Sequence, residues 1–418
     1  MSDSTILHSD GSSGQSFRKF KLVLVPLLIF SLLGQIAVVW TQLDDIRDGY
    51  FDFVLYHSAA RIVADGKGAQ LFDLSLQRDY QKDSRTTPQT RPLPFNHLPY
   101  ELLALLPVAR LSFPVAHGVW AGANFLLLMA ILFRLATFVE AAQLKLFCLM
   151  LFAFFPTLTA LKMGQDSIIT TYLLSETFIS LKQRRYGLAG CLLALGLYKP
   201  QFVLPIAGIL LCHRRWSAVL GFLLTGIALV VISVAMVGWQ GLMGLLALWL
   251  PMTERGNVVW PELMLNLRGL VYMTLNLVGM TSATNLLTLV FSLLAFFMTL
   301  RLWRRDADES SDRFDLQFAL AVVMTALVSY HLYSYDGTLL ALPLVFMFNH
   351  VLRAPPQTIK ARRIFVLLLI VMFVPLLPNI LLSAAALAWW ALPVPLLFCV
   401  IAMEIGHQSK RVAGSGRM

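Results

Sequence analysis

Four groups of polar side chains in this apolar sequence carry residue types suited to acid–base or anion-binding chemistry. They are Asp44, Asp48 and Asp52 with Tyr56; Gln165 with Asp166; Lys199 with Gln201; and His331 with Tyr335 and Asp336. Polar groups at membrane depth are costly, so each of these groups needs an explanation. A carboxylate at a helix start is held as an anion by free amide groups and the helix dipole, so it can act as a general base or merely cap its helix.

Asp52 precedes a segment with the periodicity of an amphipathic helix. The apolar residues recur at three-and-four spacing, as Phe51, Val54, Leu55, Ala59, Ile62 and Val63. Asp52 then stands in the first turn, with Tyr56 one turn further on the same side. Asp44, Asp48 and Asp52 are spaced at fours, so a continuous helix would place them on one face. Periodicity alone does not choose between these three carboxylates.

The other three groups each allow two interpretations. Asp166, in Gly164-Gln165-Asp166-Ser167, either caps the next helix or belongs to the polar mouth of a cavity. Lys199 either snorkels to the interface or binds a phosphate, and the phosphate is favoured because nothing nearby in sequence neutralises the charge. The segment from Ser329 to Asp336 either binds substrate and relays protons through His331 or anchors the chain at the interface through its tyrosines.

Composition identifies the protein class that must position these groups. The 418 residues are 58% hydrophobic and 13% charged, whereas soluble proteins average about 25% charged residues. Apolar stretches of roughly 20 residues recur along the chain, and each is long enough to cross a bilayer as a helix. The net charge is +10, and its Lys and Arg residues are spread over short loops rather than gathered in one patch. This distribution indicates membrane topology rather than nucleic-acid binding.

Several kinds of site are not indicated. The four cysteines, Cys148, Cys191, Cys212 and Cys399, lie in or beside apolar runs without paired spacing. No motif has the spacing of a metal site, a P-loop or a nucleotide fold. No loop on the predicted cytoplasmic side is large enough for a sugar-nucleotide enzyme domain.

Hydropathy and loop charge predict an all-α polytopic membrane protein of about twelve membrane segments. Residues 1–19 are expected to form a disordered cytoplasmic N-terminus, residues 20–403 a single transmembrane domain, and residues 404–418 a cytoplasmic tail. The predicted segments are 20–41, 114–137, 144–161, 166–181, the two arms of 186–212, 217–237, 281–300, 316–333, 337–352, 364–378 and 381–403.

Two predicted outer loops and one short hairpin separate these segments. Residues 42–113 form a large first outer loop with amphipathic helices, including an interfacial helix over 100–111, and residues 238–280 form a second outer loop. The arms of 186–212 have about a dozen residues each, too few to cross the hydrocarbon at about 1.5 Å per residue. The turn at Lys199 is therefore expected within the membrane or at its outer face, so all four polar groups face outside.

Taken in order, these motifs resemble glycosyltransferase family 87, the polytopic C-type transferases that use polyprenyl-phosphate sugars. The likeness runs from about residue 48 to 350, and its departures from the family pattern include Asp166 for Asn, His97-Leu98 for Tyr-Pro, Tyr330 for Pro and Gly337 for Leu. These departures touch positioning residues and bear on the acceptor more than on the reaction. The matching motifs are Asp52 to Ala60, Phe95 to Pro99, Gly164 to Ser167, Ala189 to Gln201, Asn266 to Leu270 and Ser329 to Asp336.

The resemblance implies transfer of a mannose-like hexose or a pentose from a polyprenyl phosphate to a hydroxyl of a glycolipid or glycan. Asp52 would be the general base in an inverting displacement, Lys199 would hold the leaving phosphate with Arg268 as second candidate, and His331 would orient donor or acceptor. No metal or cofactor is implied. The implied substrate-binding residues are Tyr56, Asn96, Gln165, Asp166, Lys199, Gln201, Asn266, Arg268, His331, Tyr335 and Asp336.

The expected location is the plasma or inner membrane, with both termini cytoplasmic and the active site on the outer, periplasmic face. Membrane lipids are the expected surroundings, and nucleic acid is not an expected partner. The competing class is a transporter or flippase for a lipid-linked or anionic substrate, which also has many spans with intramembrane charge. An alternating-access carrier needs a site reachable from both faces, whereas these polar groups all lie on one predicted side.

Overall fold

The computed structural model describes residues 10–84, 93–255, 260–303, 309, 311–353, 369 and 391–415, and every regular element in these ranges is a helix. The α-helices are α1 (Asp10–Thr41), α2 (Leu43–Arg47), α3 (Phe53–Ala64), α4 (Leu74–Lys82), α5 (Phe113–Ala136), α6 (Leu144–Ala153), α7 (Phe155–Met163), α8 (Ser167–Lys182), α9 (Tyr186–Ala194), α10 (Pro200–Cys212), α11 (Trp216–Arg255), α12 (Leu267–Asn276), α13 (Thr284–Leu302), α14 (Asp312–Val328), α15 (Ala341–Arg353) and α19 (Pro393–Ser415). Short 3₁₀ turns are η1 (Gly68–Gln70), η2 (Pro99–Ala104), η3 (Leu106–Val108), η4 (Ala141–Gln143), η5 (Pro261–Leu263), η6 (Thr281–Ala283) and η7 (Asp336–Leu340).

Four helical stretches in the described ranges are long and apolar enough to cross a membrane. They are Lys21–Thr41, Phe113–Ala136, Trp216–Trp249 and Thr281–Leu302. The pair α6 and α7 forms a fifth candidate, bent by 50°. The bend lies at Phe154, whose backbone is extended, and at Pro156, which lacks the amide hydrogen that a continuous helix would use. These spans agree with a multi-pass membrane protein, while the count of twelve segments stays a prediction.

Some of the predicted segments fall partly or wholly outside the described residues. The segment 364–378 and the beginning of 381–403 are among them. For the predicted tails, residues 1–9 are likewise outside the description, residues 10–19 already belong to α1, and α19 extends to Ser415.

The short hairpin is present as α9 and α10, with nine and thirteen residues. At about 1.5 Å per residue these arms are roughly 14 Å and 20 Å long, whereas the hydrocarbon core is about 30 Å thick. Pro200 begins α10, where its fixed φ suits the first helical position. Lys199 therefore stands at the tip between two helices that are each too short to span.

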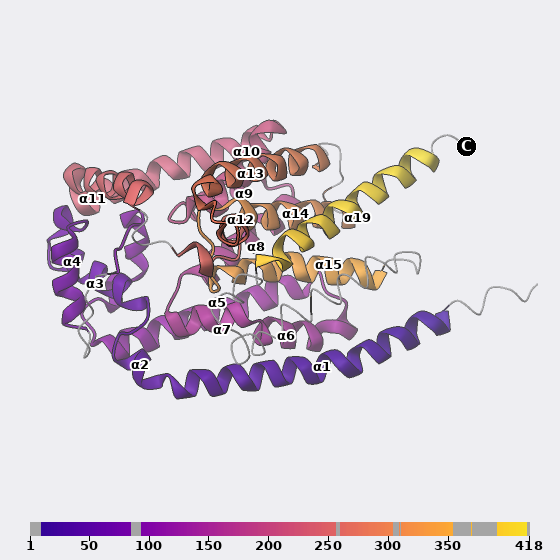
Figure 1. Ribbon diagram of the computed structural model, residues 1–418, viewed down its shortest axis with the longest axis horizontal. Coiled ribbons are helices and arrows are strands. Elements are labelled where there is room, and N and C mark those ends of the chain that lie inside the picture. Colours follow the sequence, from indigo (N-terminus) through magenta and orange to yellow (C-terminus); the bar gives the residue numbers. More distant parts are fainter. Residues whose placement is uncertain are drawn as a thin grey trace, which may run out of the picture.

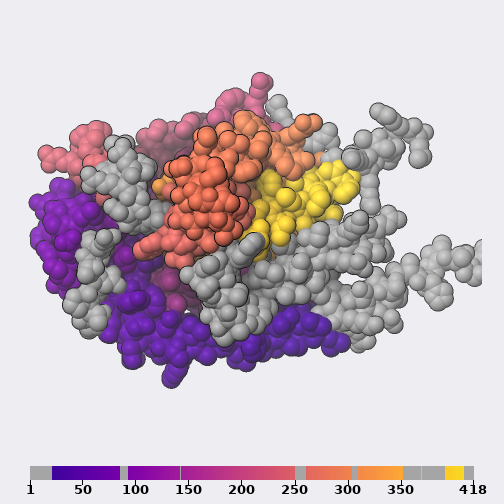
Figure 2. Space-filling view, in the orientation of Figure 1, coloured from indigo at the N-terminus to yellow at the C-terminus, as the bar shows by residue number. Residues whose placement is uncertain are grey.

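Figure 1 shows the arrangement of the helices: α1 lies along one long edge and α11 along the opposite edge, while α2, α3 and α4 gather at one end. The start of α1 and the end of α19 lie at the other end. Figure 2 shows α12 and α13 at the centre of one face, with α19 beside them and α1 along the edge. The predicted first outer loop thus supplies one end of the molecule.

Two stretches differ from the sequence prediction. The second outer loop is predicted from residue 238, and in this stretch the structure has a helix: α11 continues to Arg255 after a break at Gly238, whose φ of 69° and ψ of 171° are open to glycine. Beyond the break, Leu242 and Leu245 are buried in the apolar cluster around α3, and this packing stabilises the continued helix. The interfacial helix over 100–111 is replaced by η2 and η3, because Pro107 cannot donate the amide bond that would extend an α-helix.

Two apolar cores position the site. The larger core joins α6, α8, α10, α14, α15 and α19, and its buried residues include Phe178, Phe318 and Phe346. The smaller core surrounds α3 and contains Phe53, Phe95 and Trp120. The polar residues of the predicted motifs lie where these two cores meet.

Candidate active site

A cavity of about 720 Å³ lies between α3, the segment 93–97, the α7–α8 turn, the tip of the α9–α10 hairpin and the segment 330–336. All four polar groups predicted from the sequence contribute to its wall. Of the predicted residues, the lining includes Asp52, Tyr56, Asn96, Gln165, Lys199, Gln201, His331, Tyr335 and Asp336. The remaining predicted residues, Asp166, Asn266 and Arg268, lie outside that lining.

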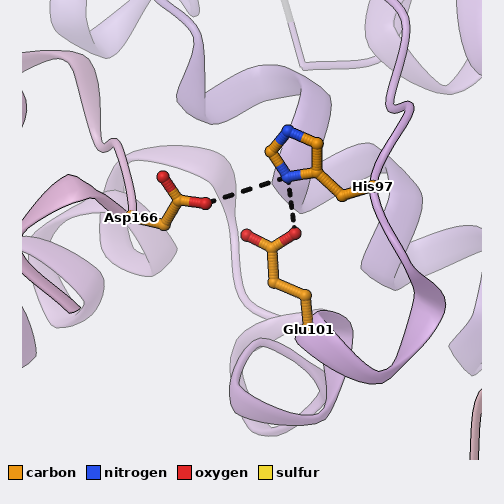
Figure 3. Close-up of side chains that lie close together, drawn as sticks. All are labelled: His97, Glu101 and Asp166. Carbon is orange, nitrogen blue, oxygen red and sulfur yellow. Dashed lines mark hydrogen bonds and ion pairs between the residues drawn. The ribbon is translucent and has the colours of Figure 1, made fainter. Parts of the chain in front are cut away.

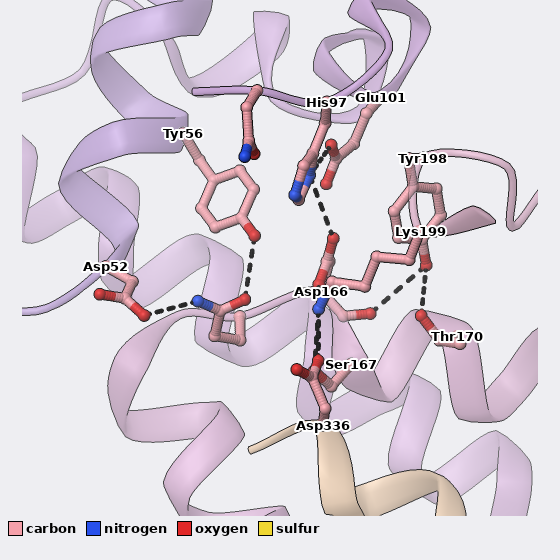
Figure 4. Close-up of polar contacts among 12 residues, drawn as sticks. Asp52, Tyr56, His97, Glu101, Asp166, Ser167, Thr170, Tyr198, Lys199 and Asp336 are labelled. Atoms are coloured by element: carbon pink, nitrogen blue, oxygen red, sulfur yellow. Dashed lines mark hydrogen bonds and ion pairs between the residues drawn. The ribbon is translucent and has the colours of Figure 1, made fainter. Parts of the chain in front are cut away.

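Asp52 is held at the cavity wall by a side-chain relay. Its carboxylate Oδ2 accepts a hydrogen bond of 2.7 Å from Nε2 of Gln165. The Gln165 Oε1 in turn accepts a bond of 2.9 Å from the hydroxyl of Tyr56. Figure 4 labels Asp52 and Tyr56, the two ends of this relay. Tyr56 thus fixes which end of the Gln165 amide faces Asp52, and Gln165 holds the Asp52 carboxylate in the cavity wall.

The alternative role for Asp52, a helix cap, is not what the structure has. Asp52 occupies the N-cap position of α3, but its backbone is helical and its side chain makes no capping hydrogen bond. The three aspartates do not share a helix face either, because α2 ends at Arg47 and Gly49 turns the chain with a φ of 69°. Asp44 is exposed and pairs with Arg47, and neither Asp44 nor Asp48 is in the cavity lining.

A close backbone approach brings Asp52 and Gln165 together. Gly164 has a φ of 68°, and a Cβ added there would lie 2.6 Å from the Cβ of Phe53. The Gly164 carbonyl accepts a bond of 2.9 Å from Nε1 of Trp120 on α5. Only glycine meets both the steric and the backbone requirement, so this residue docks the start of α3 against the α7–α8 turn.

Lys199 is buried among anions, which the sequence does not reveal. Its Nζ lies 2.5 Å from Oδ1 of Asp166 and 2.6 Å from Oδ1 of Asp336. Ser167 Oγ donates to the same Asp336 oxygen at 2.9 Å. The side chain of Lys199 is 3% exposed. The expectation of an unneutralised cation at the hairpin tip is therefore wrong: two carboxylates balance its charge (Figure 4).

Asp166 pairs with Lys199 and does not line the cavity. It occupies the N-cap position of α8 without a side-chain capping bond, and it lies behind the lining with its carboxylate on Lys199. Neither of the two roles expected for Asp166 describes it fully. The turn that carries Asp166 contributes Gln165 to the wall instead.

His97 and Glu101 complete the buried cluster, as Figure 3 shows. Nδ1 of His97 lies 2.6 Å from Oε2 of Glu101 and 3.8 Å from Oδ2 of Asp166. Burial lowers the pKa of His97 to about 4. Burial and the Asp166 carboxylate raise the pKa of Glu101 well above its usual value. Sequence analysis missed Glu101, although its i, i+4 spacing from His97 was a usable signal.

Asn266 and Arg268 lie just beyond the cavity wall. Asn266 caps α12, because its Oδ1 accepts from the Gly269 amide and its Nδ2 donates 2.8 Å to the Ser329 carbonyl. The guanidinium of Arg268 stacks 4.2 Å from the ring centroid of Tyr330, a lining residue. Within the described residues, Nε and Nη1 of Arg268 are buried and make no hydrogen bond.

Aromatic side chains form much of the remaining wall, and sequence analysis did not assign them to the site. They include Trp249, Trp260 and Tyr333. Trp249 Nε1 donates 2.8 Å to the Asn96 carbonyl, and the Tyr333 hydroxyl accepts 3.2 Å from the Trp260 amide. An apolar and aromatic wall with a few fixed polar groups is the usual character of a small-ligand site.

Comparison with protein families identifies a family for this chain. The model of glycosyltransferase family 87 matches residues 97–330, more than half of the chain. The matched region contains the α7–α8 turn, the hairpin tip and the Asn266 cap, and it begins after Asp52. Comparison with curated proteins and with solved structures gives no match.

Proposed function

We propose, from the premise that the chain belongs to glycosyltransferase family 87, that it moves a sugar from a polyprenyl phosphate to a hydroxyl acceptor at the cavity described above. The chain is thus a membrane glycosyltransferase. The proposed sugar is a mannose-like hexose or a pentose, and the proposed acceptor is a glycolipid or glycan. Family membership favours this activity over a transporter or flippase.

Asp52 is the proposed general base. One observation carries this assignment: the carboxylate lies in the cavity wall with one oxygen bound to Gln165, which Tyr56 orients. The acceptor hydroxyl gives its proton to Asp52 as its oxygen attacks the anomeric carbon of the donor sugar. The bond from that carbon to the phosphate oxygen breaks at the opposite face, so the configuration inverts. The lipid phosphate leaves with the electron pair.

Arg268 is the proposed partner of the leaving phosphate. Lys199 was the first candidate, but its ammonium is already paired with Asp166 and Asp336. Arg268 has two buried nitrogens without a hydrogen bond in the described residues, and it stacks on a ring of the cavity wall. A guanidinium matches phosphate oxygens with a planar set of donors, which suits this role. His331, in the same wall, is proposed to orient the donor or the acceptor.

The position of the cavity agrees with chemistry on the outer face. Its wall includes the start of α3, the segment 93–97 and Trp249 of α11. Figure 1 shows α3 and α4 at the end of the molecule opposite the start of α1. If the N-terminus is cytoplasmic, as the basic residues before the first span predict, this end faces the outside. We therefore place the active site at the outer face of the plasma or inner membrane.

The test is transfer of radiolabelled sugar from a panel of polyprenyl-phosphate sugars in membranes containing wild type or Asp52→Asn at matched expression. The proposal predicts labelled product from the wild type and its loss in Asp52→Asn. Labelled donor that appears on the opposite leaflet, without product from any donor of the panel, would contradict transfer and support the flippase.

A further inference from the structure

Three groups able to ligate a metal meet beside the cavity, outside the proposed transfer chemistry. One ring nitrogen of His97 and carboxylate oxygens of Glu101 and Asp166 all lie within 4.8 Å of one another. They come from the segment before η2, from η2 itself and from the start of α8, so folding brings them together (Figure 3). His97 alone among them faces the cavity.

Two carboxylate oxygens in this cluster, Oε1 of Glu101 and Oδ2 of Asp166, lack the hydrogen-bond donors that buried acceptors normally have. Glu101 is 8% exposed, and its Oε1 accepts no hydrogen bond within the described residues. Asp166 is fully buried and accepts no hydrogen bond there either, although its Oδ1 forms the ion pair with Lys199. Buried acceptors without partners are rare in folded proteins, so they point to a group that fills this space.

The charges of the cluster show what that group must carry. Glu101, Asp166 and Asp336 bring three carboxylates, whereas Lys199 brings one ammonium. With neutral His97 and all three carboxylates ionised, as ligation of a cation requires, the cluster carries two negative charges beyond the one that Lys199 balances. Buried charge is costly unless it is paired, and one divalent cation would balance this excess.

We propose that His97, Glu101 and Asp166 bind one divalent cation of the Zn²⁺ or Mn²⁺ class beside the cavity. One imidazole nitrogen with carboxylate oxygens suits these ions better than Mg²⁺ or Ca²⁺, which prefer oxygen alone. Ligand bonds of about 2.0–2.2 Å place neighbouring donor atoms roughly 3–4 Å apart. The 3.8 Å between His97 and Asp166 already fits, and the 2.6 Å between His97 and Glu101 needs to open slightly.

Lys199 remains compatible with this site. It binds Oδ1 of Asp166, while Oδ2 of the same carboxylate is the oxygen directed at His97. A ligating carboxylate that also accepts from a second group is held in one orientation, which is a common outer-shell arrangement. The cation would tie the segment that carries Asn96 and His97 to the start of α8. It would support the cavity wall and take no part in the proton transfer to Asp52.

The test uses the full-length protein, purified in detergent, stripped with a chelator and dialysed. Titration with MnCl₂, followed by electron paramagnetic resonance of free Mn²⁺, is expected to give one bound ion per chain, displaced by Zn²⁺. Glu101→Gln and Asp166→Asn are expected to weaken binding at least tenfold. Glu176→Gln is the matched control, because Glu176 pairs with Arg134 at a distance from the cluster. The control is expected to bind as the wild type does.

Thermal unfolding separates loss of the site from loss of the fold. The cation is expected to raise the melting temperature of the wild type and Glu176→Gln but not of Glu101→Gln. If Asp166→Asn fails to fold, His97→Gln supplies the second ligand variant. Absence of binding to the wild type, or equal binding by the wild type and both ligand variants, would overturn the proposal. Neither readout needs a sugar donor, so this test is independent of the proposed transfer reaction.

Discussion

Helix α8 has a cluster of charged side chains at each of its ends. At its N-terminal end, Asp166 and Ser167 contact Lys199. At its C-terminal end, Lys182 pairs with Asp315, and just beyond it Glu309 pairs with Arg215. The sixteen residues of α8 separate these clusters by about 24 Å.

The clusters differ in balance and in exposure. Around Glu309, Arg215 lies at 2.6 Å and Arg184 at 3.5 Å, and the Arg184 side chain is 69% exposed. In the described part of that end, Asp315 pairs with Lys182, and Glu309 has two arginines within 4 Å. Around Lys199, Asp166 and Asp336 share one ammonium, and Glu101 contacts His97 beside them. These side chains are nearly all buried, and a cavity adjoins them. Balanced ion pairs at a rim hold helices together, whereas an unbalanced buried cluster beside a cavity marks a site that acts on a ligand.

Among the substitutions that test this contrast, Lys199→Met is expected to cause the largest loss of stability. It leaves Asp166 and Asp336 as buried carboxylates without their cation, and removal of one partner of a buried ion pair costs about 3–5 kcal/mol. Lys182→Met, at the other end of α8, leaves Asp315 with partial access to solvent, and its loss of stability is expected to be smaller. Chemical denaturation of both variants measures the difference. Equal losses would show that the two ends are energetically alike.

The next largest effect is expected on activity, when the arginine proposed to bind the leaving phosphate is removed. Arg268→Ala is expected to lower kcat/KM for the lipid donor about 10- to 100-fold, because hydrogen bonds to charged groups are worth about 1.5–3 kcal/mol. Arg134→Ala is the control: Arg134 forms a partly exposed pair with Glu176, and such pairs contribute roughly 0–1 kcal/mol. An Arg268→Ala enzyme with unchanged kcat/KM, together with a strong loss in Lys199→Gln at retained stability, would return the phosphate to Lys199.

A smaller effect concerns the stability of the cavity end in acid. His57 on α3 is buried, and burial with nearby Arg61 lowers its pKa to about 4. Between pH 6.5 and 4 the unfolded chain binds a proton that the folded chain does not, so stability falls as the pH decreases through this window and is complete above it. The expected loss is about 1 kcal/mol by pH 5.5. His57→Gln, which does not titrate, should remove this part of the pH dependence in unfolding curves.

The sequence was sufficient for the parts of the site that depend on local pattern. Hydropathy predicted helices at the candidate spans, and motif order predicted that Asp52, Gln165, Lys199 and His331 belong together. The short arms around Lys199 followed from counting apolar residues. These features depend on neighbours within a few turns of helix, which a single sequence displays.

The remaining parts depend on contacts between distant residues. Lys199 meets Asp336 across 137 positions, so no local pattern reveals that its charge is balanced. Trp249 reaches the cavity because α11 continues beyond Gly238, where Leu242 and Leu245 pack against the α3 core. Asn266 was expected to bind substrate, yet its amide serves the α12 cap and Ser329.

The most direct measurement is the transfer rate of purified Asp52→Asn and Asp48→Asn with saturating donor, after unfolding curves have shown that both variants are folded. A general base contributes about 10²- to 10⁴-fold, so Asp52→Asn is expected to lose that factor. Asp48→Asn is expected to keep nearly the wild-type rate, because Asp48 is not in the cavity lining. A full rate for Asp52→Asn with loss in Asp48→Asn would contradict the assignment of the base.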